Sequence, residues 1–188
     1  ARFPAGSYAA PTNLTLSCNI NQNGIIGSPD SIIHTNFLNF SIFINGSVLN
    51  LSNNYLEQMQ LELRENTSTR VSMTYNFSIP LDLSAIKVEK QGPSSPFGYI
   101  IVSGLDVEKT VYLNKLNSTS NRVCVKDALV SSISSLTANC TDSTELIVNC
   151  PGNNGSIICS VLGAFFSVSG ISHSAIKEII SWLPNNCI

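Results

Sequence analysis

Apolar and polar side chains alternate without a break between residues 70 and 79, and this alternation constrains the fold more than any other feature. One set is Val71, Met73, Tyr75, Phe77 and Ile79, and the other is Arg70, Ser72, Thr74, Asn76 and Ser78. A period of two residues predicts a β-strand with one buried face and one face in solvent. A helix, with about 3.6 residues per turn, would not separate the two sets.

The same period recurs along much of the chain. It covers 13–20, 36–45, 48–51 and 57–64, and shorter apolar strands are expected at 99–102, 109–113, 123–125, 145–150, 156–161 and 165–168. The strands 145–150 and 156–161 are expected to pair as a hairpin around the turn P-G-N-N-G-S. In 36–45 we expect four inward side chains, which are Leu38, Phe40, Ile42 and Ile44. This many short strands predicts an all-β fold, mainly an Ig-like antiparallel β-sandwich, built as one unit or as two packed sub-domains.

Turn-forming residues divide this pattern. Residues 91–98 read Q-G-P-S-S-P-F-G and predict a linker or long loop between an N-terminal sandwich part (13–90) and a C-terminal disulfide-rich module (99–188). Residues 1–12 contain two prolines and show no period. They are either a mobile terminus or an extended arm that packs on a neighbouring subunit as a donor strand. We expect a mature chain whose secretion signal was removed or never included.

A helix is expected only near the end of the chain. Ser172 is a candidate N-cap for residues 173–183, and Pro184 would stop the helix. The apolar positions Ile176, Ile179, Ile180 and Leu183 follow the spacing i, i+3, i+4, i+7. This helix would plug one end of the sandwich or contact a partner subunit.

The chain has six cysteines, two histidines and no C-x-x-C pair. Structural zinc sites need closely spaced cysteine or histidine pairs, so disulfides in an oxidising compartment are favoured over a metal site. Six cysteines allow 15 pairings. We prefer Cys124–Cys140, Cys150–Cys159 and Cys18–Cys187, and an intersubunit bond from Cys18 or Cys187 remains open.

Asparagine followed by any residue except proline and then by serine or threonine is the acceptor sequon for N-glycosylation. The chain contains nine sequons, at Asn13, Asn39, Asn45, Asn50, Asn66, Asn76, Asn117, Asn139 and Asn154. We place five of them on polar strand faces, namely Asn13, Asn39, Asn45, Asn50 and Asn76, and Asn66 in a turn. Only 12% of the residues are charged, so attached glycans would supply the solubility that charge usually gives. The alternative is a loop composition that makes sequons by accident.

Several classes of function are disfavoured. The net charge is −2 and no basic run occurs, so we expect no nucleic-acid partner. No apolar stretch is long enough for a membrane span. Neither His34 nor His173 lies beside a nucleophile motif, and we expect no enzyme activity, no metal and no cofactor beyond covalent N-glycans. Asp142 and Glu145 are a weak calcium-loop candidate, and solvated turn residues are the stronger interpretation.

Motifs in the second half of the chain carry a resemblance. They are K-T-V-Y-L-N-K (109–115), S-N-R-V-C-V-K-D-A (120–128), V-S-S-I-S-S-L (130–136), Cys140, L-I-V-N-C-P-G (146–152), I-I-C (157–159) and V-S-G-I-S-H-S-A-I-K-E (168–178). This block resembles a cysteine-containing β module of archaeal secreted and cell-surface glycoproteins, over about residues 97–178. The chain is also similar in character to subunits of archaeal extracellular filaments. The resemblance implies a cell-surface location and assembly with copies of itself, in some cases by donor-strand complementation.

The first hypothesis is therefore a structural subunit of an extracellular glycosylated filament, pilus-like, or of a surface layer. The alternative is a cell-surface adhesin or binding module for carbohydrate or protein. A carbohydrate-binding sheet should expose aromatic rings. Aromatic residues make up only 7% of the chain, and Phe43 and Tyr112 are the two expected to point outward.

Overall fold

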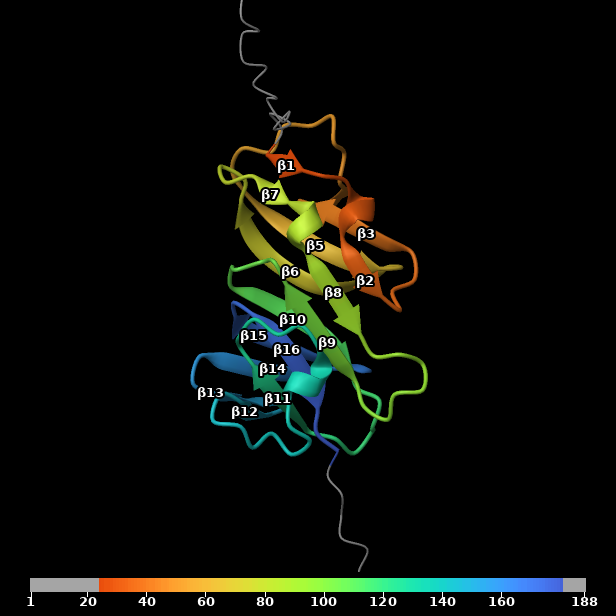
Figure 1. The fold of residues 1–188 in the computed structure, drawn as a ribbon, viewed down its shortest axis with the longest axis vertical. Helices are drawn as coiled ribbons and strands as arrows, with labels where there is room; N and C mark the ends of the chain where they lie inside the picture. The colour runs from red at the N-terminus through yellow and green to blue at the C-terminus, as the bar shows by residue number, and fades with distance from the viewer. Residues whose placement is uncertain (1–23, 181–188) are drawn as a thin grey trace, which may run out of the picture.

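A computed structural model describes residues 24–180, and these residues form an all-β fold whose sheets are mainly antiparallel (Figure 1). The only helical segments among them are three short 3-10 turns, η1 (Pro29–Ser31), η2 (Leu83–Ala85) and η3 (Ile133–Ser135). Residues 1–12, the predicted strand 13–20 and the terminal residues 181–188 lie outside the described part.

The larger sheet has eight antiparallel strands in the order β13-β14-β15-β10-β6-β5-β3-β4. Their bounds are β13 (Gly152–Asn154), β14 (Ile157–Leu162), β15 (Phe165–Ile171), β10 (Lys109–Asn114), β6 (Ser68–Asn76), β5 (Gln58–Glu65), β3 (Phe40–Ile44) and β4 (Ser47–Val48). The β5–β6 hairpin, the clearest alternation in the sequence, lies inside this sheet.

The smaller sheet has six strands in the order β12-β11-β16-β9-β8-β2. Their bounds are β12 (Leu146–Asn149), β11 (Arg122–Lys126), β16 (Ser174–Glu178), β9 (Tyr99–Ser103), β8 (Lys87–Lys90) and β2 (Ile33–Thr35). All neighbours are antiparallel except β2, which pairs with β8 in parallel. A separate parallel pair joins β1 (Ile25–Ile26) to β7 (Leu81–Asp82).

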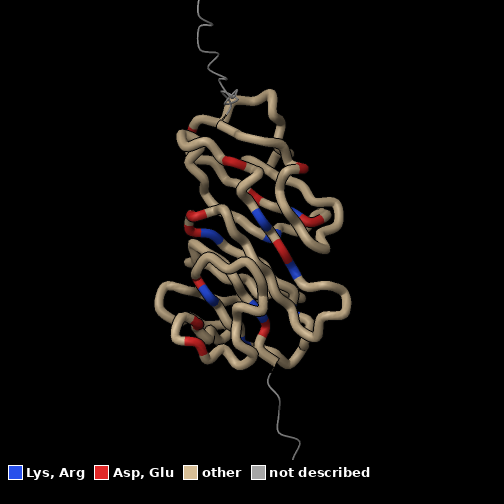
Figure 2. The backbone as a smooth tube through the Cα atoms, viewed as in Figure 1, with Lys and Arg blue, Asp and Glu red and all other residues tan. Residues whose placement is uncertain are grey.

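One hydrophobic core receives side chains from both sheets. The eight-stranded sheet contributes residues such as Leu61, Leu63 and Val71, and the six-stranded sheet contributes residues such as Ile100 and Val125. Each of these side chains is at most 1% exposed. Among the described residues six charged ones are also buried, namely Glu65, Arg70, Lys109, Glu145, Lys177 and Glu178. Figure 2 shows that most of the backbone carries no charged residue.

The opposite face of the six-stranded sheet is also covered. Ile101, Cys124 and Ala175 point to this side, where they pack with Leu136 and Cys140 from the loop between β11 and β12. Successive side chains of a strand point to opposite faces of the sheet. The sequence neighbours of these residues, namely Ile100, Val123, Val125 and Ile176, therefore face the main core instead. The central strands of this sheet are therefore buried on both faces.

This double burial explains why the predicted helix over 173–183 is wrong for residues 174–178. These residues form β16, a central strand between β11 and β9, and all five are buried. A strand covered on both faces loses the period of two that identifies a half-buried strand. Its apolar residues then matched a helical spacing by coincidence.

Residues 91–98 form the loop of a hairpin and do not separate two sheets. β8 ends directly before this loop, β9 begins directly after it, and the two strands pair antiparallel. Both sheets contain strands from 13–90 and from 99–188, because β8 pairs with β9 in the smaller sheet and β6 pairs with β10 in the larger one. The two predicted parts of the chain therefore share one hydrophobic core.

Three predicted side-chain directions are wrong. Leu38 and Ile79, expected inward, are 67% and 64% exposed, because each lies just outside its strand. Arg70, expected on the solvent face, is 6% exposed because it forms an ion pair with Glu65 inside the protein.

Candidate functional site

The sequon asparagines lie at the surface of the described structure. Eight of the nine fall within residues 24–180, and Asn13 lies outside the described residues. Seven are exposed and Asn117 is half-buried, the exposed ones being Asn39, Asn45, Asn50, Asn66, Asn76, Asn139 and Asn154. A glycan is attached to the side-chain amide nitrogen, so these positions permit its transfer from solvent.

Most of these asparagines lie in turns and at strand ends. Asn39, Asn45 and Asn66 have φ values of 47°, 48° and 52°, the left-handed region that asparagine tolerates better than most residues. The expectation that Asn39, Asn45 and Asn50 lie on polar strand faces is wrong, because none of the three belongs to a strand. Asn76 is the last residue of β6, and Asn66 lies in the predicted turn.

Three sequons each contain the same type of local hydrogen bond. The side-chain Oδ1 of Asn50, Asn76 and Asn117 accepts from the backbone N–H two residues later, at 2.9, 3.0 and 3.0 Å. That later residue is the serine or threonine of the same sequon. The bond fixes the orientation of the amide and leaves its Nδ2, the atom that receives a glycan, available.

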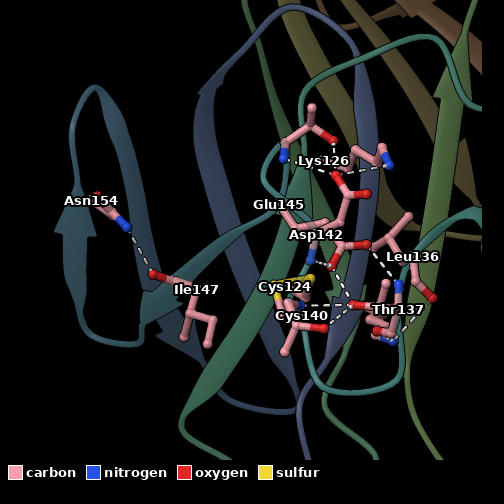
Figure 3. The surroundings of a disulfide bond; sticks show 12 residues. Cys124, Lys126, Leu136, Thr137, Cys140, Asp142, Glu145, Ile147 and Asn154 are labelled. Carbon is pink, nitrogen blue, oxygen red and sulfur yellow. Dashed lines mark hydrogen bonds and ion pairs between the residues drawn. A yellow bond between two sulfur atoms is a disulfide. The ribbon is translucent and has the colours of Figure 1, made fainter.

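Two sequon asparagines use Nδ2 as a donor. Asn39 Nδ2 donates to Oδ1 of Asn66 at 2.9 Å, and Asn154 Nδ2 donates to the carbonyl oxygen of Ile147 at 3.0 Å (Figure 3). An N-linked glycan replaces one of the two amide hydrogens, so the remaining N–H can keep either bond.

Two disulfides hold the part of the structure that follows β11. Cys124 on β11 bonds to Cys140 in the next loop with a Cα–Cα distance of 5.6 Å (Figure 3). Cys150 bonds to Cys159 on β14 with a Cα–Cα distance of 5.0 Å. These are the two pairs preferred from the sequence, and the third pair, Cys18–Cys187, lies outside the described residues.

The hairpin around Cys150 differs from the one expected. Residues 145–150 and 156–161 were predicted to pair with each other, but β12 pairs with β11. The strand that pairs with β14 is β13, which forms within the expected turn. The disulfide thus connects the end of one sheet to a strand of the other.

Glu145 organises the loop beside the Cys124–Cys140 bond. Its carboxylate accepts from the backbone N–H of Thr137 at 2.6 Å, from the Thr137 hydroxyl, and from the N–H of Asp142 at 3.1 Å (Figure 3). Burial raises the pKa of Glu145, but these hydrogen bonds outweigh it and leave the pKa below its usual value. The Lys177 ammonium donates to the Thr137 carbonyl on the inner side.

Asp142 and Glu145, the calcium-loop candidates from the sequence, both accept hydrogen bonds within this loop. Glu145 is buried and its oxygens are hydrogen-bonded to the loop, whereas Asp142 is exposed and accepts from Thr144 N–H at 2.8 Å. Sγ of Cys124, Sγ of Cys140 and a Glu145 oxygen lie within 4.8 Å of one another. The two sulfurs are bonded to each other, so they are not thiolate ligands.

A buried charge cluster lies between β5, β6 and β8. The Glu65 carboxylate accepts from Arg70 Nε at 2.9 Å, Arg70 Nη2 at 2.5 Å, Lys90 Nζ at 2.5 Å and the Leu38 N–H at 3.0 Å. Burial raises the pKa of Glu65, but the bonds from Lys90, Leu38 and Arg70 together lower it below its usual value. The cluster ties the β5–β6 hairpin to β8 of the other sheet.

Two more buried charges hold loops to the sheets. The Glu178 carboxylate accepts the backbone N–H groups of Gly98, Leu116 and Asn117 at 3.0, 3.0 and 2.9 Å. Lys109 is 2% exposed and donates to the Ser172 carbonyl. Burial lowers the pKa of Lys109 to about 8, against the smaller opposing effect of nearby Asp127 and then Asp106.

The histidines and aromatic rings take other structural positions. The His34 ring stacks on Phe40 at 4.8 Å between centroids, and His173 Nε2 lies 3.3 Å from the Asp106 carboxylate. Within residues 24–180 neither imidazole bonds to a serine, threonine or cysteine side chain. Phe43 and Tyr112, expected outward, are half-buried, and the Arg64 guanidinium covers the Phe43 ring at 3.8 Å.

Comparison with known proteins found no match to a family model, to a curated protein or to a solved structure. Across residues 24–180, no helix has the length and apolar character that crossing a membrane requires.

Proposed function

We propose that the protein is a structural subunit of an extracellular, N-glycosylated filament or surface layer. The observation that carries the proposal is the surface position of the sequons, since seven of the eight described asparagines are exposed. Two disulfides support the same environment, because such bonds persist in oxidising compartments. We further infer that the two sheets form an Ig-like β-sandwich, in which one core lies between the facing sheets.

Exposed apolar residues at both edges of the six-stranded sheet support assembly by β contacts. On the edge strand β12, Leu146 and Ile147 are 40% and 39% exposed, and Ile158 on nearby β14 is 53% exposed. At the other edge, Ile33 on β2 is 59% exposed. Edge strands with apolar side chains favour pairing with another chain. On β12 the Ile147 carbonyl is bound by Asn154 within the protein, so the pairing there would use the remaining edge groups. Two different edges suit a head-to-tail contact that extends into a fibre.

The predicted donor arm, residues 1–12, lies outside the described residues. Under this proposal the arm of one subunit adds a strand to the next, with main-chain hydrogen bonds supplying affinity. The adhesin alternative has less support, because all phenylalanine and tyrosine side chains in residues 24–180 are buried or half-buried. A sugar-binding surface normally offers an exposed ring.

Negative-stain electron microscopy of the native, cell-derived protein tests the proposal. We expect regular fibres or sheets, and their loss when residues 1–12 are deleted. Mass spectrometry of the same material should find glycans on the exposed sequons. Dispersed globular particles with measurable affinity for a glycan would replace the structural role with the adhesin role.

A further inference from the structure

A surface pocket of about 450 Å³ opens where β16 leaves the six-stranded sheet. Its walls are mostly apolar and come from three segments, represented by Phe97, Ile133, Leu136 and Ile179. Its size lies within the range of small-molecule sites. Phe97 and Ile133 are only half-buried, so the described structure leaves this apolar surface partly in contact with solvent.

One sequon lies in the wall of this pocket. Asn139 is exposed and lines the pocket directly. Its position is fixed by its neighbours, since Cys140 is bonded to Cys124 and the Thr141 N–H donates to the Thr137 hydroxyl oxygen at 2.8 Å. A group attached to Asn139 would therefore start from a rigid point at the pocket rim.

The Asn139 side chain differs from the other sequons. Among the eight described sequon asparagines, it is the one whose amide makes no hydrogen bond with residues 24–180, whereas Asn39 and Asn154 use Nδ2 and the others use Oδ1. Its amide can turn toward the pocket without losing a bond. Asn45 also lines a hollow, but that hollow is surrounded mainly by polar residues such as Ser47 and Asn53.

We propose that the N-glycan on Asn139 folds back on the protein and covers this pocket with its first sugar rings. The inference rests on the proposed function, which makes the chain a glycoprotein. A pyranose ring has an apolar C–H face that packs on side chains such as Phe97 and Ile133, and a hydroxyl rim that stays in water. Covering the pocket removes apolar surface from solvent, which stabilises the folded protein.

Periodate oxidation of the native glycoprotein, followed by site-resolved mass spectrometry, tests the inference. Periodate cleaves free vicinal diols, so the rates are compared on the diol-bearing sugars of each glycan, and a sugar held against the protein should react more slowly. We expect the glycan at Asn139 to be oxidised several-fold more slowly than the glycan at Asn76, which lines none of the described pockets. The difference should vanish in urea.

Two variants identify the pocket as the cause. Ile133→Ser keeps the sequon but weakens the apolar wall, and it should bring the oxidation rate at Asn139 to that at Asn76. Asn139→Gln should open the pocket to an apolar fluorescent dye, whereas Asn76→Gln, the matched control, should not. Equal oxidation rates in the native protein, or no change in Ile133→Ser, would overturn the inference.

Measuring which sequons carry a glycan distinguishes a failure of this inference from a failure of the glycoprotein proposal. If Asn139 carries no glycan while other sequons do, the inference fails and the glycoprotein proposal stands. If no sequon carries a glycan, the glycoprotein proposal fails with it.

Discussion

Replacing Glu65 by glutamine should destabilise the protein strongly, although the substitution is almost isosteric. The carboxylate is 3% exposed and accepts four hydrogen bonds, from Arg70, Lys90 and the Leu38 N–H. Glutamine presents an NH2 group to some of these donors and leaves the buried Arg70 and the half-buried Lys90 without this counter-charge. Removing one partner of a buried ion pair costs about 3–5 kcal/mol.

The matched control is Glu62→Gln on the same strand. Glu62 pairs with Arg64 where the side chains are 20% and 25% exposed, so solvent screens the pair. Surface pairs of this kind contribute about 0–1 kcal/mol. Urea denaturation of both variants, with equal m-values, measures the two losses directly.

The pH dependence gives an independent measurement of the same cluster. The pKa of Glu65 in the folded protein is below its ordinary value of 4.5. Its contribution to stability is therefore present above that ordinary value and is lost as the pH falls through the folded pKa. Glu65→Gln should reduce the loss of stability in acid relative to the wild type. A cost for Glu65→Gln no larger than for Glu62→Gln would refute the reasoning.

Three further variants test packing, charge and cross-linking. Gly98→Ala should cost about 1–3 kcal/mol, because the new Cβ would lie 1.8 Å from a β10 backbone carbonyl oxygen, whereas Gly92→Ala in the same loop meets nothing closer than 3.7 Å and should be near neutral in thermal unfolding. Lys109→Met should abolish part of the rise in stability between pH 8 and 10.5, since burial lowers the folded pKa to about 8 and the unfolded chain then binds more protons in that range; an unchanged slope in urea titrations would contradict this. The double substitution of Cys150 and Cys159 by alanine should cost about 2.6 kcal/mol from the entropy of a loop with a sequence separation of 9, and an unchanged urea midpoint would contradict that loop-entropy argument.

The sequence predicted those strands best that have one buried and one solvated face. In β5 and β6 the residues Leu61, Leu63, Val71 and Met73 are buried as the alternation indicates. The pattern failed where both faces are covered, as in β16, because burial on both sides removes the period. It also failed at Arg70, whose burial depends on its ion pair with Glu65 from the neighbouring strand β5.

The candidate sites could be predicted only where the signal is local in the sequence. Local signals located the sequons and the two disulfides of the second half. The pocket beside Asn139 could not be found from sequence, because it joins residues near 97, 133 and 179. The buried acceptor roles of Glu145 and Glu178 were also missed, since the N–H groups that they bind belong to loops whose positions only the fold defines.

The order of strands has a consequence for how the chain acquires its structure during synthesis. β16 occupies the middle of the six-stranded sheet, between β11 and β9, and β10 connects β6 to β15 in the other sheet. Neither sheet can close until residues 165–178 have left the ribosome, so early segments must wait for late ones. Such long-range pairing slows folding, because chain entropy is lost before the contacts form. With this topology both sheets lack strands until residue 178 has been synthesised, so the earlier strands expose unpaired edges to their surroundings during that time.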